Sequence, residues 1–255
     1  VVPTGIDADH FKSGDGSNIR QKFEIPDDSF VVGHVGRLAS EKNLRFLTDA
    51  VSRLLKKKPN SRFLIAGDGP FRQELDAFTA EQNISEQVIF TGVLEGQELV
   101  DAYHAMDIFA FSSLTETQGM VLAEAMSAGL PVVALKASGV SDILEDDENG
   151  FMIQKQDAEQ FSQKLETFMN ASKDRRRKMT EKALETADRF SLEACADRVL
   201  DIYQKLLRDH NFHNKDESIW QTAMELVKAE WDIFLNYMNA TGEMISSNQN
   251  SREKG

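Results

Sequence analysis

Short apolar runs alternate with longer amphipathic stretches along residues 30–170, and this alternation restricts the fold more than any other feature. The runs are rich in β-branched and aromatic residues, as buried strands are, and lie at 30–35, 62–66, 88–90, 108–111, 131–135 and 151–153. The stretches between them have helical periodicity and lie at 43–57, 71–82, 98–105, 119–128 and 158–170. Parallel strands need such helical crossovers, which cover both faces of a sheet. The sequence therefore predicts an α/β fold, a Rossmann-like doubly wound parallel sheet.

The chain becomes wholly helical after about residue 173. Two amphipathic helices are expected at 174–189 and 192–207, and the Ser191 hydroxyl is suited to cap the second of them. We predict one domain over 1–209, a helical extension over 210–245 and a disordered polar tail over 246–255.

The predicted extension carries an apolar stripe over 219–238. Such a stripe needs a partner surface, and we expect it to dock on its own domain or on one outside this chain. A membrane surface suits it less, because Glu225, Glu230 and Asp232 outnumber Lys228.

Net charge and cysteine content exclude several classes of function. With 29 Lys plus Arg against 42 Asp plus Glu, the formal charge is −13, so nucleic acid is not expected as a partner. The single cysteine, Cys195, fits a core position in a protein of a reducing compartment. No apolar run is long enough to span a membrane and the amino end lacks a signal-peptide layout, so we expect a cytoplasmic protein. The start at Val1 leads us to expect a piece of a longer chain.

The turn after the first predicted strand combines a glycine with two cations. Ligands of open α/β sheets bind beyond the carboxyl ends of the strands, where this turn lies. Gly36 lets a bulky anion approach the backbone, Arg37 offers a planar fork of donors, and Lys42 adds a mobile charge. These residues suit phosphate oxygens. The alternative is a structural ion pair among Arg37, Glu41 and Lys42 at the start of a helix.

A second polar turn follows the fourth predicted strand and leads into a helix that we expect to begin near Thr117. The first N–H groups of a helix have no partner within it and carry the positive end of its dipole. The N–H groups of Gln118, Gly119 and Met120 are therefore predicted to form a second anion site.

Two glutamates accompany this helix start. Glu116 lies just before it and Glu124 about two turns further on, so both carboxylates can line one groove. Carboxylates accept hydrogen bonds from hydroxyl groups, and beside the N–H groups they describe a site for a ligand both sugar-like and anionic. In the alternative interpretation Glu116 only caps the helix and Glu124 is solvated. The apolar neighbours of Glu124 argue against solvation and require a partner for its carboxylate.

Other motifs carry less information. Gly67-Asp68-Gly69-Pro70 lacks the third glycine of the dinucleotide fingerprint and no Walker-type loop is present, which disfavours nicotinamide and ATP-hydrolysis chemistry. Asp7 and Asp9 have the spacing of metal-dependent sugar transferases but follow no strand, so we predict neither a metal site nor a cofactor. His34 is expected on a strand near the ligand edge, without a nucleophile beside it.

Four ordered motifs resemble one enzyme family. They are the run Val2-Pro3-Thr4-Gly5-Ile6-Asp7, the Gly36-Arg37 turn with Glu41-Lys42-Asn43, the Gly67-Asp68-Gly69-Pro70 turn, and the stretch from Glu116 to Glu124 continued by Ala128-Gly129-Leu130-Pro131. Together they resemble the nucleotide-sugar-binding half of the retaining GT-B glycosyltransferases, a family that includes glycogen synthases and many bacterial mannosyl- and glucosyltransferases. The resemblance spans 1–207 and implies that the domain at 1–209 binds the donor nucleotide.

The resemblance implies a role for each candidate residue. Arg37 and Lys42, beside Gly36, would hold the donor diphosphate and neutralise it as it leaves. The donor sugar would be held by Glu116, Gln118, Gly119 and Met120. Glu124 would accept from the ribose hydroxyls, and the backbone near Val93 and Leu94 would border the base. The implied reaction is a front-face displacement that needs no metal, in which the leaving phosphate takes the acceptor proton.

The family also implies a second, acceptor-binding domain before Val1, so this chain is expected to bind the donor without turning it over. The Thr117-Gln118-Gly119 run resembles that of glycolipid-forming members, which suggests a glycolipid acceptor and peripheral membrane association. Two alternatives remain open at this point. One is an epimerase or phosphorylase of the same fold, and the other is a non-catalytic subunit that binds sugar nucleotides. The base, the sugar and the acceptor are not specified by the sequence.

Overall fold

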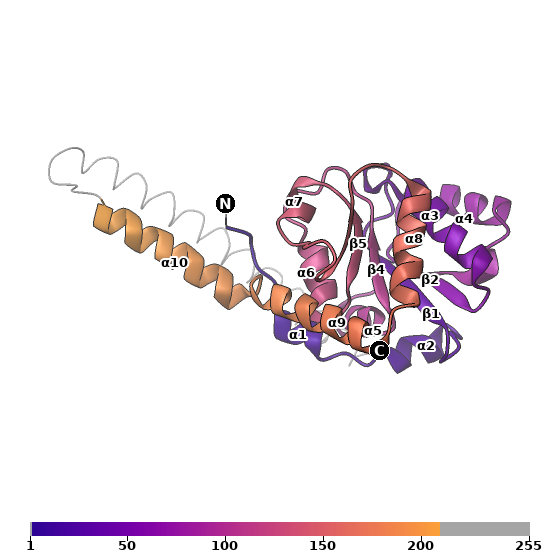
Figure 1. Ribbon diagram of the computed structural model, residues 1–255, viewed down its shortest axis with the longest axis horizontal. Helices are drawn as coiled ribbons and strands as arrows, with labels where there is room; N and C mark the ends of the chain where they lie inside the picture. Colours follow the sequence, from indigo (N-terminus) through magenta and orange to yellow (C-terminus); the bar gives the residue numbers. More distant parts are fainter. Residues whose placement is uncertain (1, 210–255) are drawn as a thin grey trace, which may run out of the picture. The chain divides into compact units, whose positions relative to one another are not determined.

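The computed structural model describes residues 2–209, in which a parallel sheet lies between two layers of helices (Figure 1). All predicted strands are present, as β1 (Phe30–Val35), β2 (Ser61–Ala66), β3 (Val88–Gly92), β4 (Ile108–Phe111), β5 (Val132–Leu135) and β6 (Gly150–Ile153). Their order is β3-β2-β1-β4-β5-β6, and every pair of neighbours is parallel. The predicted doubly wound α/β fold is confirmed.

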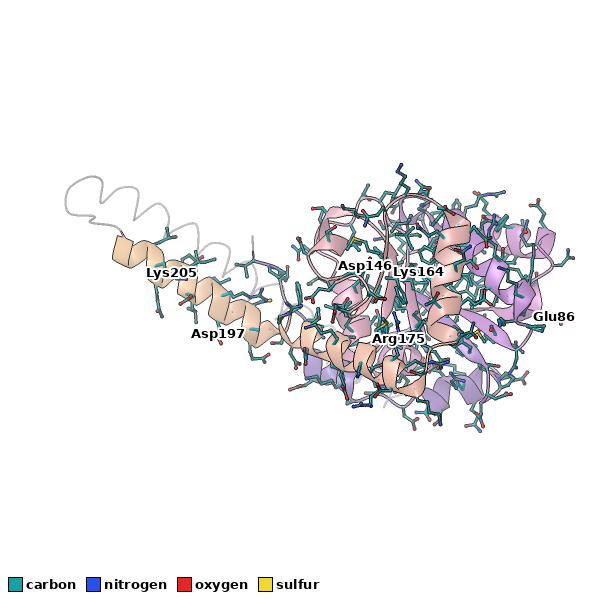
Figure 2. All side chains as sticks on the ribbon, in the orientation of Figure 1. Glu86, Asp146, Lys164, Arg175, Asp197 and Lys205 are labelled. Atoms are coloured by element: carbon teal, nitrogen blue, oxygen red, sulfur yellow. The ribbon has the colours of Figure 1, made fainter. Side chains whose placement is uncertain are left out.

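The two helical layers bury opposite faces of the sheet. One layer consists of α3 (Leu44–Lys57), α4 (Arg72–Glu81) and α8 (Ala158–Met169). The other consists of α1 (Ala8–Lys12), α2 (Gly16–Lys22), α5 (Gly96–His104), α6 (Met120–Ser127) and α9 (Lys173–Asp188). Successive residues of a strand point to opposite faces, so Phe109 packs with the α5 and α6 layer while Ala110 packs with the α3 layer. Charged side chains such as Glu86 and Arg175 lie on the outside (Figure 2).

The predicted helices are confirmed to within two residues at each end, and the last of them is α10 (Leu192–Asp209). The Ser191 hydroxyl accepts from the Ala194 N–H (3.1 Å), as the predicted cap requires. The short elements not predicted are α1, α2, α7 (Ser138–Ser141), η1 (Ser40–Lys42) and η2 (Ser85–Gln87). The predicted extension at 210–245, with its apolar stripe, and the predicted tail at 246–255 lie outside the described residues.

Backbone contacts join the carboxyl ends of β1, β2 and β3. The Gly36 N–H donates to the Ala66 carbonyl (3.0 Å), and the Gly67 N–H donates to the Gly92 carbonyl (2.8 Å). Gly67 has a φ of 140°, and a Cβ atom there would lie 2.0 Å from the Gly36 carbonyl oxygen. The Gly67 turn therefore supports the Gly36 turn by direct backbone approach, which only glycine permits.

Gly67→Ala is expected to lower the free energy of unfolding more than Gly92→Ala does. Gly92 has a φ of 75° but a Cβ atom there would meet nothing within 4 Å, so it is the matched control. The left-handed backbone alone costs about 1–2 kcal/mol for a residue with a Cβ. Gly67→Ala also displaces the Gly36 turn, and we expect a loss of about 3 kcal/mol or more. Urea unfolding followed by circular dichroism measures both losses, and equal losses would show that the contact contributes nothing.

Candidate functional site

Two loops meet at the carboxyl edge of the sheet because β1 and β4 are neighbours. Directly after β4, the Ser112 hydroxyl donates to the backbone carbonyls of Lys42 (2.8 Å) and Asn43 (3.1 Å). The Asn43 side-chain amide donates back to the Ser112 carbonyl (3.4 Å). The turns at 36–43 and 112–119 therefore form one continuous edge, and candidate residues from both come together there.

Lys42 and Glu116 form an ion pair across this edge, with Nζ 3.4 Å from Oε2. Their side chains are only 28% and 16% exposed, so this pair is better shielded from water than most surface pairs. The other Glu116 oxygen, Oε1, accepts from the Gly119 N–H (3.1 Å), so Glu116 closes the turn before helix α6 and does not cap the helix itself. Helix α6 begins at Met120 rather than near Thr117, and the residue before it, Gly119, has left-handed backbone with a φ of 69°.

Arg37 lies at the same edge with an exposed side chain. Within residues 2–209 its guanidinium makes no hydrogen bond, ion pair or ring contact, and the ion pair with Glu41 that the alternative interpretation required is not present. By contrast, Arg45 and Arg53 both have carboxylate partners. A guanidinium without a carboxylate partner offers its whole fork of donors to an anion.

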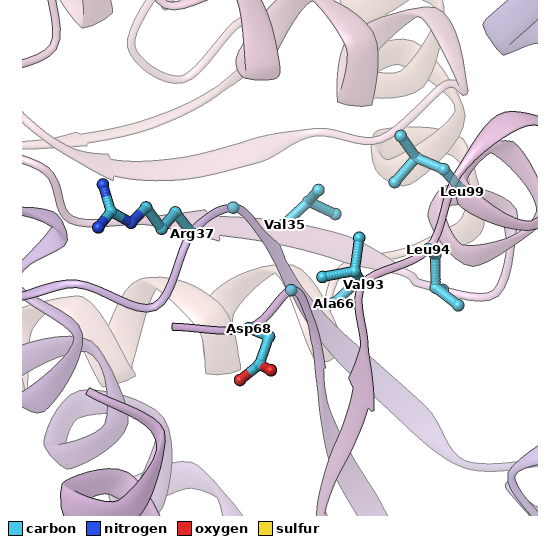
Figure 3. Close-up of a pocket in the computed structure, with 9 residues that line it drawn as sticks. Val35, Arg37, Ala66, Asp68, Val93, Leu94 and Leu99 are labelled. Atoms are coloured by element: carbon cyan, nitrogen blue, oxygen red, sulfur yellow. The ribbon is translucent and has the colours of Figure 1, made fainter. Parts of the chain in front are cut away.

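A pocket of about 420 Å³ opens beside Arg37 at the ends of β1, β2 and β3 (Figure 3). It is lined by Val35, Gly36, Arg37, Ala66, Gly67, Asp68, Val93, Leu94 and Leu99. Figure 3 shows Arg37 at one end of the pocket and Leu99 at the other. The predicted Val93 and Leu94 belong to its wall, whereas Leu99 was not identified from the sequence. Such mostly apolar walls with a few polar groups suit a flat organic ring joined to an anion.

Glu124 lies on α6, where its half-buried carboxylate accepts a hydrogen bond from the Tyr103 hydroxyl at Oε2 (2.7 Å). Burial raises the pKa of Glu124, and the bond from Tyr103 acts in the opposite direction. Burial also raises the pKa of Tyr103 well above its ordinary value, so the phenol stays a donor. The partner that the apolar neighbours of Glu124 required is therefore a tyrosine on α5.

His34 lies on β1 beneath the same edge and is 1% exposed. Its Nδ1 is 3.0 Å from the Ala110 carbonyl, and its ring stacks with Phe111. Burial lowers the pKa of His34 to about 4, so the ring is neutral at pH 7. Nδ1–H then donates to Ala110, and Nε2 is an acceptor without a partner in the described part of the chain.

Gln118 connects the site to the beginning of the chain. Its side-chain Oε1 accepts from both the Thr4 hydroxyl (2.8 Å) and the Thr4 N–H (3.3 Å). The side chain of Met120, two residues later, packs against the core under α6. Of the candidate groups around this helix start, the side chains of Glu116 and Gln118 and the predicted anion-binding N–H of Gly119 thus already have protein partners.

Two further candidates have structural roles. The Asp7 carboxylate caps α1 by accepting from the His10 N–H (3.0 Å), and Cys195 is buried as expected. Over residues 2–209 no cluster of three or more His, Cys, Asp or Glu side chains has an arrangement suited to a metal ion. None of the helices in that range combines the length and apolar character needed to cross a bilayer.

Comparison with known proteins shows which family the chain is similar to. Residues 15–186 match the family described as glycosyl transferases group 1. The chain is 34% identical to the sulfoquinovosyl transferase SQD2 of Arabidopsis thaliana over 76% of this chain and 38% of that protein. It is 34% identical to the alpha-monoglucosyldiacylglycerol synthase of Acholeplasma laidlawii over 61% of this chain and 40% of that protein. The chain thus spans less than half the length of these relatives.

A solved structure extends the likeness to the fold. The chain is similar to Alr3699/HepE of Anabaena, crystallised with UDP and glucose, with a TM-score of 0.72 and 25% identity. The match covers 80% of this chain and 56% of HepE. The family model, the relatives and the fold agree, and the chain belongs to the group 1 glycosyltransferases, which have the GT-B fold.

Proposed function

We propose that the chain is the donor-binding half of a retaining glycosyltransferase that uses a UDP-sugar. The observation that carries this proposal is the placement of the unpaired Arg37 and the shielded Lys42 on one sheet edge, beside a mostly apolar pocket. A nucleoside diphosphate has the matching order of parts, a flat base followed by two phosphates. The UDP bound to HepE supports uridine as the base.

Each part of the donor has a counterpart in this arrangement. The base lies against Val93 and Leu94, and the ribose hydroxyls donate to Glu124. The diphosphate takes charge-assisted hydrogen bonds from Arg37 and Lys42. The transferred sugar lies against Glu116, whose carboxylate accepts from its hydroxyl groups.

The proposed reaction exchanges one glycosidic bond for another on the same face of the sugar. The bond between the anomeric carbon and the diphosphate oxygen breaks, and the electron pair stays on the diphosphate. The acceptor oxygen bonds to the anomeric carbon, and its proton passes to the leaving diphosphate. Arg37 and Lys42 stabilise the negative charge that develops there, which is the role that fixed cations perform best in a partly shielded site. On this proposal the two side chains supply the positive charge that a metal ion supplies in other transferases.

The acceptor is proposed to bind to a second domain that this chain does not include. The short span of the chain relative to its relatives supports this division. The Acholeplasma relative is named for the synthesis of a glycolipid, alpha-monoglucosyldiacylglycerol. This name supports a lipid acceptor and a reaction at a membrane surface. With the second domain absent, the 255-residue chain should bind a donor without transferring its sugar.

Arg37→Ala is expected to weaken UDP binding about 10- to 150-fold, because hydrogen bonds to a charged group contribute about 1.5–3 kcal/mol. Isothermal titration calorimetry on the 255-residue chain measures the change. Arg53→Ala is the matched control, since Arg53 lies on α3 and pairs with Asp49 and Glu159. The control should bind UDP as the parent chain does. Unchanged affinity in Arg37→Ala would remove this residue from the donor site.

A thermal-denaturation panel of UDP-glucose, GDP-mannose and ADP-glucose tests the donor class. A sugar nucleotide at a hundredfold excess over its dissociation constant stabilises the folded chain by about 2.7 kcal/mol. We expect the UDP-sugar to raise the melting temperature most. A larger rise with another nucleotide would overturn uridine as the base, and no rise with any of the three would overturn the proposed function.

A further inference from the structure

Tyr103 connects the proposed ribose-binding carboxylate to the wall of the pocket. Its hydroxyl donates to Glu124 Oε2 at 2.7 Å, and this bond joins α5 to α6. Leu99, one helical turn earlier on α5, lines the pocket at the end opposite Arg37. Residues four apart share a helix face, so the pocket wall and the Glu124 contact are built on the same side of α5.

The position of the Tyr103 hydroxyl is fixed by its surroundings. The side chain is fully buried, and its ring packs edge-to-face on Phe11 with centroids 5.6 Å apart. A second ring, that of Phe109 on β4, is tilted against Tyr103 with the two centroids 5.8 Å apart. A phenol enclosed by two aromatic rings has little freedom to turn, so its hydroxyl stays directed at Glu124.

The electrostatic setting of Glu124 has two contributors. Burial raises its pKa, and the hydrogen bond from Tyr103 lowers it. Helices α1 and α9 also pack on α6, and one lysine on each has carboxylate partners elsewhere: Lys12 pairs with Asp9 and Asp188, and Lys182 with Glu145 and Glu185. The hydrogen bond from Tyr103 is thus the contact that favours the ionised form of Glu124.

The geometry points to Tyr103 as a positioning residue for donor binding, which acts through Glu124 and does not touch the donor itself. Its hydroxyl occupies Oε2 and favours the ionised form, so Oε1, which has no partner among the described residues, is left for the ribose hydroxyls. A protonated carboxyl would offer fewer lone pairs to a diol. This inference rests on the proposed function, because it assumes that Glu124 accepts from the ribose.

Tyr103→Phe tests the inference, because it removes the hydroxyl and keeps the ring. UDP and 2′-deoxy-UDP binding are measured by calorimetry across pH 4–8 with the 255-residue chain. The parent should prefer UDP, and its affinity should fall as Glu124 becomes protonated at low pH. In Tyr103→Phe the pKa of Glu124 rises, so this fall should occur at higher pH. At neutral pH UDP affinity should drop about tenfold, while 2′-deoxy-UDP affinity changes less.

Glu124→Gln is the control variant, because it lacks the carboxyl through which Tyr103 is proposed to act. This variant should bind UDP with no pH-dependent fall from this carboxyl, and adding Tyr103→Phe to it should change UDP affinity no further. If Tyr103→Phe lowers only the melting temperature, and leaves the pH profile and the preference for UDP unchanged, the tyrosine is structural and the inference is overturned. A parent chain that binds no nucleotide would instead contradict the proposed function, and one that binds UDP and 2′-deoxy-UDP equally would contradict the role of Glu124.

Biosynthetic incorporation of 3-fluorotyrosine is the second test of the inference, for use if the Tyr103→Phe variant does not fold. The fluorinated phenol is more acidic and donates more strongly, so the pKa of Glu124 should fall. The loss of UDP affinity should then move to lower pH, opposite to the effect of Tyr103→Phe. A profile that does not move would overturn the inference.

Discussion

The adjacency of β1 and β4 is the constraint on which the whole site depends. From β1 the chain adds β2 and β3 on one side and then returns to place β4, β5 and β6 on the other. The loops that follow β1 and β4 therefore meet at the carboxyl edge of the sheet, at the switch point where open α/β sheets bind their ligands. Pairing of Gly33 with Phe109 sets the relative height of the two strands, and the Ser112 hydroxyl then fixes one loop to the backbone of the other. Arg37, Lys42 and Glu116 take their positions from this arrangement, whereas the pocket wall at Val93 and Leu94 follows β3.

Much of this fold follows from local patterns. The six strands could be located because each is a compact apolar run between turn residues, and a buried parallel strand has that composition. Helices α1 and α2 could not, because five and seven residues are too few to display a helical period. They are held by capping from Asp7 and Asp15, which sequence patterns show only weakly.

The candidate residues were accessible to sequence reasoning, but their partners were not. Arg37 and Glu116 stand in short motifs after strands, so their placement at the sheet edge follows from topology alone. The Lys42–Glu116 pair joins residues 74 positions apart, and the Tyr103–Glu124 bond joins α5 to α6. Such pairs depend on strand order and on the angle between helices, neither of which leaves a local trace in the sequence. Glu124 was identified as needing a partner, yet the spacing of residues gave no means to choose Tyr103.

The backbone approach of Gly67 to Gly36 has a consequence for how this enzyme family diversifies. The part of the pocket floor that supports the Gly36 turn is made of the peptide groups of Gly36 and Gly67, so it does not depend on the side chains that line the rest of the pocket. Variation at Val93, Leu94 and Leu99 can reshape the opposite end of the cavity while that floor keeps its form. Exchange of these side chains should therefore change the shape of the pocket without moving the Gly36 turn, as long as Gly67 itself is retained.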